Sequence, residues 1–237
     1  GTRLGVFDPY SGEALGVTRT ITDGSYLDNP PASLTWRSGE KAVCLGLHGS
    51  GLHCFAATEM RELLHFSIPT SHPEVQTPVV ADIDNDGQPE LFFIATTDDF
   101  GLVSLYGINQ SNELLAGYPV TWTGGVDTPL VAADLDNNGQ LELISTSLAP
   151  AEDAYDRQIS LLVINPADGQ LLANTSANLA DPDGGALALA DLDNDRQVEV
   201  VLQGHQQLTV QQWDGSHFRT KAGWESVAAG WRDWSSP

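Results

Sequence analysis

Aspartates occupy every second position in one short segment of the chain. In the segment 82–90, which reads DIDNDGQPE, Asp82, Asp84 and Asp86 are followed by Glu90. Carboxylates about 4 Å apart repel one another by roughly 1 to 4 kcal/mol per pair, depending on the effective dielectric constant. A divalent cation removes this repulsion, and a set of hard oxygen ligands favours Ca²⁺ over Zn²⁺ or Mg²⁺. The segment therefore predicts a calcium-binding loop.

The same pattern occurs twice more, as DLDNNGQLE from Asp134 and as DLDNDRQVE from Asp191. We expect ligands from the side chains at loop positions one, three, five and nine and from the backbone carbonyl at position seven. The expected ligands are Asp82, Asp84, Asp86, Gln88 and Glu90 in the first loop, Asp134, Asp136, Asn138, Gln140 and Glu142 in the second, and Asp191, Asp193, Asp195, Gln197 and Glu199 in the third.

Two other interpretations of these loops are weaker. An EF-hand requires glutamate at position twelve, where this chain has Phe93, Ser145 and Leu202. A simple solvated turn explains one acidic segment, but three copies favour a metal. Of up to three Ca²⁺ ions, the third is expected to bind most weakly, because Arg196 replaces a glycine that allows a left-handed backbone and adds a positive charge near the ion.

The loops mark a repeat, since they begin at residues 82, 134 and 191, at intervals of 52 and 57 residues. Each unit has a short apolar strand, the acidic loop, a second strand, and a third strand followed by a turn. A further unit from Ala32 has strands but places Trp36, Arg37 and Lys41 where the carboxylates would be, which predicts a repeat without metal.

Four-stranded units of this length are typical of a β-propeller, in which neighbouring sheets bury each other's faces. We therefore predict an all-β chain forming one propeller domain over 1–237, with about five blades that close alone or belong to a larger ring. A β-sandwich and an open solenoid are the alternatives. The predicted blades are 29–76, 77–127, 128–184 and 185–222, with a terminal blade shared by 1–20 and 223–237.

The three loops resemble the D-x-D-x-D-G-x-x-[DE] calcium loops of FG-GAP repeats, as in the integrin α-subunit propeller and many bacterial secreted proteins. The resemblance extends over about 77–218 and implies a propeller with calcium held between the first two strands of a blade. The Phe-Gly and Gly-Ala-Pro signatures of the family are not evident, and the chain contains no Arg-Gly-Asp sequence.

Composition excludes several classes of partner. The chain has 32 acidic and 10 basic residues and a formal net charge of −22, which opposes binding to nucleic acid or anionic lipid. The apolar runs are far shorter than the roughly 20 residues that span a bilayer, so no membrane insertion is expected. Because the chain starts without methionine and inside a patterned segment, we expect it to derive from a longer precursor, whose other domains are potential partners.

Two cysteines flank a predicted hairpin. Cys44 and Cys54 enclose LGLHGSGLH, whose turn near Gly49 would place the two sulfurs opposite each other. A disulfide and a pair of buried thiols both remain open. A zinc site that uses His48 and His53 together with the two cysteines is disfavoured. His53 and Cys54 are adjacent on one strand, so their side chains point to opposite faces.

No catalytic or cofactor-binding constellation is expected, and most of the six histidines are predicted to lie at the surface or in turns. Acidic groups outside the loops are interpreted as solvated; they are Asp98, Asp99, Glu152, Asp153 and Asp156. The candidate tryptophans either stack on a ligand or fill the core; they are Trp122, Trp213, Trp224, Trp231 and Trp234.

The sequence thus predicts a secreted, cell-surface or periplasmic adhesion or recognition module, stabilised by calcium and binding a protein or glycan. A lyase or hydrolase acting on polysaccharide, and a structural or sensory domain of an envelope assembly, are the alternatives.

Overall fold

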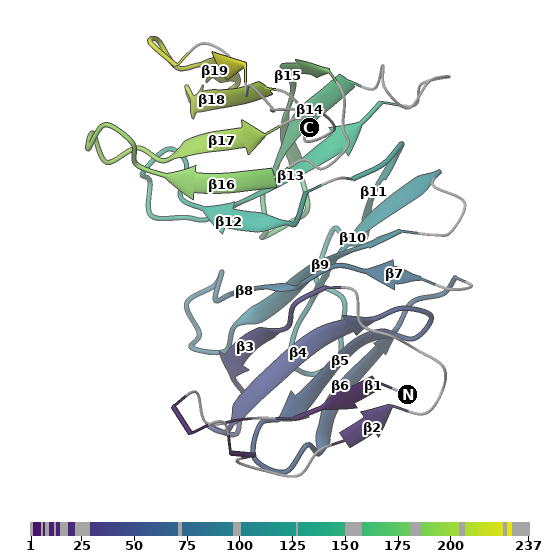
Figure 1. Ribbon diagram of the computed structural model, residues 1–237. Helices are drawn as coiled ribbons and strands as arrows, with labels where there is room; N and C mark the ends of the chain where they lie inside the picture. The colour runs from purple at the N-terminus through teal and green to yellow at the C-terminus, as the bar shows by residue number, and fades with distance from the viewer. Residues whose placement is uncertain are drawn as a thin grey trace, which may run out of the picture. The chain divides into compact units, whose positions relative to one another are not determined.

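The computed structural model describes most of the chain, and β-strands dominate it (Figure 1). The described residues are 2–5, 7, 10–11, 13–14, 19–21, 29–70, 73–96, 101–126, 128–149, 158–180, 186–203, 207–224 and 227–228. Within these ranges there is no α-helix, and hence none that could cross a bilayer.

The chain divides into two compact units. The first comprises Gly1–Trp122 and Pro166–Gly169, and the second comprises Thr123–Asn165 and Gln170–Pro237. Each unit contains two sheets of four or five antiparallel strands. The expectation of an all-β chain built from four-stranded sheets is therefore confirmed.

The first sheet has the order β3-β4-β5-β6. Its strands are β3 (Ala32–Thr35), β4 (Lys41–Leu47), β5 (Gly51–Ala56) and β6 (Glu62–Ser67). Gly49 and Gly51 have φ of 78° and 130°, which residues with a β-carbon rarely adopt. They lie at the turn between β4 and β5, as predicted. Cys44 pairs with Cys54 across this hairpin, and the two form a disulfide.

The second sheet runs in the order β11-β10-β9, and the far edge of β9 pairs with both β7 and β8. Its strands are β7 (Glu74–Val75), β8 (Val79–Ala81), β9 (Glu90–Thr96), β10 (Leu102–Ile108) and β11 (Val120–Thr123). Residues 91–94 are fully buried on both faces, which explains why β9 has a continuous apolar sequence rather than an alternating one.

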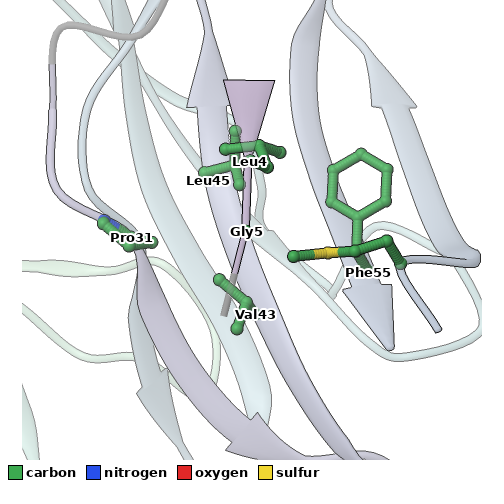
Figure 2. Close-up of a pocket in the computed structure, with 7 residues that line it drawn as sticks. Leu4, Gly5, Pro31, Val43, Leu45 and Phe55 are labelled. Atoms are coloured by element: carbon green, nitrogen blue, oxygen red, sulfur yellow. The ribbon is translucent and has the colours of Figure 1, made fainter. Parts of the chain in front are cut away.

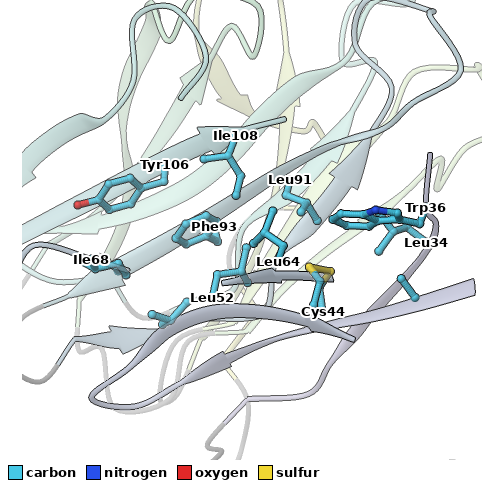
Figure 3. Packing of buried hydrophobic residues seen from close by; sticks show 14 residues of the cluster. Leu34, Trp36, Cys44, Leu52, Leu64, Ile68, Leu91, Phe93, Tyr106 and Ile108 are labelled. Atoms are coloured by element: carbon cyan, nitrogen blue, oxygen red, sulfur yellow. A yellow bond between two sulfur atoms is a disulfide. The ribbon is translucent and has the colours of Figure 1, made fainter. Parts of the chain in front are cut away.

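These two sheets share one core (Figure 3). The core contains the disulfide, Leu52 and Leu64 from the first sheet and Leu91 and Phe93 from the second. The ring of Phe93 stacks on Tyr106 with the centroids 5.3 Å apart. Apolar burial of this kind contributes about 25 cal/mol for each Å² removed from water, so this core stabilises the sheet pair.

The second unit repeats this arrangement. Its sheets have the orders β12-β13-β14-β15 and β16-β17-β18-β19, and β20 also pairs with β18. The strands are β12 (Val131–Ala133), β13 (Glu142–Leu148), β14 (Gln158–Ile164), β15 (Leu171–Ala180), β16 (Ala186–Ala190), β17 (Glu199–Gln203), β18 (Gln207–Trp213), β19 (Phe218–Thr220) and β20 (Val227–Ala228). Both sheets contribute to one core, for example Ile144 and Val163 from one and Val200 and Leu202 from the other.

The chain ends are described only in part. Strands β1 (Thr2–Leu4) and β2 (Arg19–Ile21) form a separate two-stranded sheet. The rest of the predicted terminal blade lies largely outside the described residues, so its sharing between 1–20 and 223–237 stays a prediction.

Candidate metal centres

Each acidic loop joins the first strand of a sheet to the second. The loops lie between β8 and β9, between β12 and β13, and between β16 and β17. The closing glutamate is the first residue of the second strand, and it pairs with the alanine just before the loop. These glutamates, Glu90, Glu142 and Glu199, are 6%, 7% and 0% exposed.

Hydrogen bonds within the first loop hold its carboxylates in place. The two side-chain oxygens of Asp82 accept from the N–H groups of Asp86 and Gly87, at 3.1 and 2.9 Å. At the other end of the loop, Glu90 Oε2 accepts from the Ile83 N–H at 3.0 Å. The first and last acidic residues thus fold the backbone around a central space.

The second and third loops have the same bonds. Asp134 accepts from the N–H groups of Asn138 and Gly139 at 2.9 and 2.8 Å. Asp191 accepts from those of Asp195 and Arg196 at 3.1 and 3.0 Å. Glu142 and Glu199 accept from the residues that follow the first aspartate, which are Leu135 and Leu192.

A left-handed backbone occurs at the same two positions of every loop. Position four is an asparagine each time, with φ of 58–67°. Position six is Gly87, Gly139 or Arg196, with φ of 83°, 88° and 72°. The expectation that Arg196 must adopt a glycine-like conformation is therefore confirmed, and it carries a strain that the two glycines avoid.

Carboxylate oxygens converge in each loop to within 4.8 Å of one another. The groups are Asp82, Asp84 and Asp86; Asp134, Asp136 and Glu142; and Asp191, Asp193 and Glu199.

Burial raises the pKa of Glu90. The hydrogen bond from the Ile83 N–H opposes this rise, and the negative charges of Asp84 and Asp82 add to it. Burial likewise raises the pKa of Glu142, with Asp136 and Asp134 adding to the effect. Both loops hold more negative charge than their surroundings compensate, and this donor set fits Ca²⁺.

The glutamines at position seven contribute backbone geometry. The N–H groups of Gln88, Gln140 and Gln197 donate to the side-chain oxygen at position five, at 2.7 to 2.8 Å. Their role as carbonyl ligands stays a prediction, as does Asn138 as a side-chain ligand.

The third loop is contacted by a residue that the sequence analysis missed. Lys221 lies 22 residues beyond Glu199, and its Nζ donates to Glu199 Oε1 at 2.8 Å and to Asp193 Oδ2 at 2.7 Å. The Lys221 side chain is only 8% exposed. Burial alone would lower the pKa of Lys221, but the hydrogen bonds to Asp193 and Glu199 outweigh it and raise the pKa. The hydrogen bond from Lys221 in turn lowers the pKa of Asp193.

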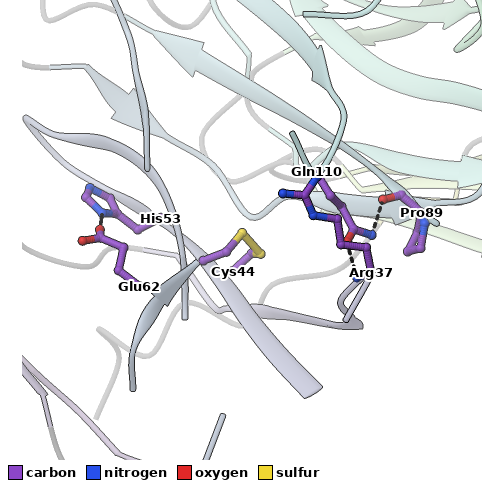
Figure 4. The surroundings of a disulfide bond; sticks show 7 residues. Arg37, Cys44, His53, Glu62, Pro89 and Gln110 are labelled. Carbon is purple, nitrogen blue, oxygen red and sulfur yellow. Dashed lines mark hydrogen bonds and ion pairs between the residues drawn. A yellow bond between two sulfur atoms is a disulfide. The ribbon is translucent and has the colours of Figure 1, made fainter. Parts of the chain in front are cut away.

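A second polar cluster lies beside the disulfide (Figure 4). His53 is 7% exposed, so it is an exception to the prediction that most histidines lie at the surface or in turns. Its Nδ1 lies 2.7 Å from Glu62 Oε1, and its Nε2 lies 2.8 Å from Ser50 Oγ. The His65 ring stacks on it at 4.0 Å.

A Ser-His-Glu arrangement can activate the serine as a nucleophile. Catalysis of acyl transfer also needs free backbone N–H groups that donate to the oxyanion of the transition state. Here the N–H of Ser50 donates to Leu47 O, and the N–H of Gly49 donates to Pro73 O. Both of these turn amides are thus engaged, so neither is available to donate to an oxyanion. We interpret the cluster as a structural set of polar and stacking contacts that links strands β5 and β6.

One small pocket opens beside this cluster (Figure 2). Its volume is about 80 Å³, and its lining is apolar: Leu4, Gly5, Pro31, Val43, Leu45, Phe55 and Met60. Ligand sites have volumes of roughly 300 to 1,000 Å³ and place a few polar groups toward the ligand. The pocket therefore does not qualify as a ligand site.

The other expected residues are partly placed. Trp213 is buried against Phe218, with ring centroids 5.1 Å apart, so it fills the core, whereas Trp224 is 41% exposed. Several candidates lie outside the described residues, namely His72, Asp98, Asp99, Glu152, Asp153, Asp156, His205, Trp231 and Trp234.

Comparison with protein families matches residues 82–145 to the model of the FG-GAP-like repeat. Over these residues the chain is thus similar to an FG-GAP-like repeat. The match confirms the resemblance stated from the sequence, and it includes the loops at Asp82 and Asp134. Comparison with curated proteins finds no match.

Two solved structures also resemble the chain. A rhamnogalacturonan lyase, YesW, is 13% identical, with a TM-score of 0.51 over 92% of this chain and 46% of the lyase. The V. cholerae biofilm matrix protein Bap1 is 15% identical, with a TM-score of 0.38 over 75% of this chain and 34% of Bap1. The chain spans about half the length of the lyase, and this likeness concerns the fold alone.

Proposed function

We propose that the chain is a calcium-stabilised β-propeller module that acts outside the cytoplasm, in adhesion to or recognition of a protein or a glycan. The observation that carries this proposal is the threefold recurrence of one loop, with converging carboxylates and a buried closing glutamate. A merely solvated turn does not require a glutamate buried to 6% or 7% exposure beside two or more aspartates.

Calcium would be held by the oxygen ligands of the first two loops. Asp82, Asp84, Asp86 and Glu90 supply carboxylates in the first, with the Gln88 carbonyl. Asp134, Asp136 and Glu142 do so in the second, with Asn138 and the Gln140 carbonyl. When bound, the ion supplies the positive charge that these crowded carboxylates lack. The loop amides hold the first and last carboxylates in position beforehand, so little ordering is required on binding.

The propeller architecture is supported by the sheets themselves. In each of the four sheets, four strands pair in sequence order, with β7 added beside β9 and β20 beside β18, and the central strands are largely buried, as in propeller blades. The fold likeness to about half of a larger protein agrees with either a ring of about five blades or an arc of a larger ring.

An extracytoplasmic location is supported by the disulfide between Cys44 and Cys54, since disulfides persist in oxidising compartments. Extracellular calcium, in the range of about 10⁻³ M, also fills weak sites that cytosolic calcium would leave empty.

The proposal is tested by binding of the purified chain to arrays of glycans and matrix proteins, in calcium and in chelator. The matched control carries Asp84→Asn and Asp136→Asn, which remove one charge from each of the first two loops while keeping an oxygen. We expect calcium-dependent signals that the control loses. Silence of a folded sample in both conditions would instead favour a structural or sensory domain within a larger assembly.

A second candidate is an enzyme acting on polysaccharide, which is favoured by the fold shared with a rhamnogalacturonan lyase. Release of shorter or unsaturated products from acidic polysaccharides would support this candidate over simple recognition. Binding without any change in polysaccharide length would support the module.

A further inference from the structure

Lys221 occupies a defined place in its sheet, and the same place can be found in the neighbouring sheets. In each one, the residue after the closing glutamate pairs with the third strand. These pairs are Leu91 with Ile108, Leu143 with Ile164, and Val200 with Gln211. The residue before that partner then meets the next segment of chain. These pairs are Gly107 with Leu115, Val163 with Ala173, and Val210 with Lys221.

The equivalent residues are therefore apolar in the two sheets with the first and second loops and cationic in the third. Leu115 and Ala173 cannot neutralise a carboxylate, whereas Lys221 extends to Glu199 and Asp193. Lys221 is one of only two lysines in a chain of net charge −22. Its contacts with the third loop thus depend on a substitution at one ladder position and not on a different fold.

The Lys221 ammonium contacts carboxylate oxygens that a calcium ion in this loop would need as ligands. Nζ lies 2.8 Å from Glu199 Oε1 and 2.7 Å from Asp193 Oδ2, and both carboxylates belong to the converging group of that loop. Calcium bound to the same oxygens at roughly 2.3 to 2.6 Å would meet the ammonium at short range. Two cations cannot share these oxygens without strong repulsion.

Charge leads to the same conclusion. The first loop has four carboxylates, and the third also has four, from Asp191, Asp193, Asp195 and Glu199. Lys221 and Arg196 add two positive charges to the third loop, so its net charge is −4 + 2 = −2, against −4 in the first. The third loop keeps the acidic residues of a calcium site but carries only half of the net negative charge of the first loop.

We propose that Lys221 is the built-in cation of the third loop, so that this loop folds without calcium and excludes the ion. The inference that calcium binds only the other two loops rests on the proposed function. The role of Lys221 in neutralising Asp193 and Glu199 does not.

The first test uses backbone amides as a reporter for each loop. The N–H groups of Gly87, Gly139 and Arg196 all donate to the first aspartate of their loop, so an NMR calcium titration of the labelled chain reads the loops separately. We expect saturable shifts at Gly87 and Gly139 and none at Arg196. A saturable shift at Arg196 in the unmodified chain overturns the inference.

The second test removes the lysine. In Lys221→Ala, the Arg196 amide should now respond to calcium, with a dissociation constant of about 10⁻⁴ to 10⁻³ M, as in extracellular modules. Lys221→Gln keeps most of the side-chain length and serves if the alanine variant does not fold. Lys41→Ala is the matched control, because it removes the same charge from an exposed lysine whose Nζ donates to Thr35 Oγ1. A third loop that ignores calcium in a folded Lys221 variant, while Gly87 and Gly139 respond, overturns the inference.

A third test separates this inference from the proposed function. In chelator, Lys221→Met should lower Tm by roughly 10 °C, because it leaves a buried carboxylate without its partner. Glu199→Gln in the same background should recover part of the loss. If Gly87 and Gly139 are silent but this coupling is found, the calcium function fails and the internal cation stands. If Lys221→Met melts like the unmodified chain, the internal cation fails.

Discussion

Removing one charge from the first loop should have opposite effects with and without calcium. The change is Asp84→Asn. Asp84 Oδ1 accepts from the Asp86 N–H at 3.1 Å, and Asp82 accepts from the same N–H at 3.1 Å. Asparagine keeps an oxygen acceptor at this position, so the loop retains its shape and loses only a carboxylate charge.

The magnitude follows from binding linkage. At free calcium of a hundred times Kd, one site adds about 2.7 kcal/mol to the free energy of unfolding, or roughly 5 to 11 °C of Tm for a chain of this size. If Asp84→Asn weakens Kd about a hundredfold, the remaining contribution is about 0.4 kcal/mol, or roughly 1 to 2 °C. In chelator, the variant should melt slightly higher than the unmodified chain, because three carboxylates whose oxygens lie within 4.8 Å of one another become two.

The assay is thermal unfolding by circular dichroism in calcium and in chelator. Asp193→Asn is the matched control, since Asp193 holds the same loop position but pairs with Lys221. The control should lower Tm equally in both conditions. Equal shifts for Asp84→Asn in calcium and in chelator would refute the assignment of the first loop to calcium.

Three further outcomes are expected. Arg196→Gly should relieve strain at φ 72° and raise Tm, yet leave the third loop without calcium while Lys221 is present; calorimetry showing an extra bound ion would contradict this. Replacing Cys44 and Cys54 by alanine should cost about 3 kcal/mol of stability, because it removes the crosslink of a short loop, measured by urea unfolding against the oxidised, disulfide-bonded chain; an unchanged midpoint would contradict it. Hydrogen bonds from His217 and Ser216 lower the pKa of Asp214 from 3.8 to about 2, so its stabilisation is complete above about pH 4 and lost toward pH 2; an NMR titration midpoint near 4 would disprove that.

Features that depend on neighbours in sequence could be predicted from the residues. The loop from Asp82 to Glu90 is local, because its first and last carboxylates bond to amides four to seven residues away. The pairing of Cys44 with Cys54 follows from the two-residue period of a strand and a short turn.

Features that depend on strand pairing could not be predicted. Lys221 reaches Glu199 because β18 pairs with β17 and the segment that follows β19 pairs with β18. No rule of sequence spacing connects the two residues. The burial of His53 depends on β5 being covered on both faces, which a single alternating strand pattern does not reveal.

The equal length of the three loops has a consequence for how such repeats change. In every case the glutamate lies nine positions after the alanine with which it pairs, so the strands on either side keep their register whichever cation lies between them. A repeat can therefore exchange a diffusible ion for a tethered ammonium, or the reverse, by point substitution without any insertion or deletion. The segment 82–90 should be transplantable into the position of 191–199, which would let the calcium requirement of each sheet be set independently.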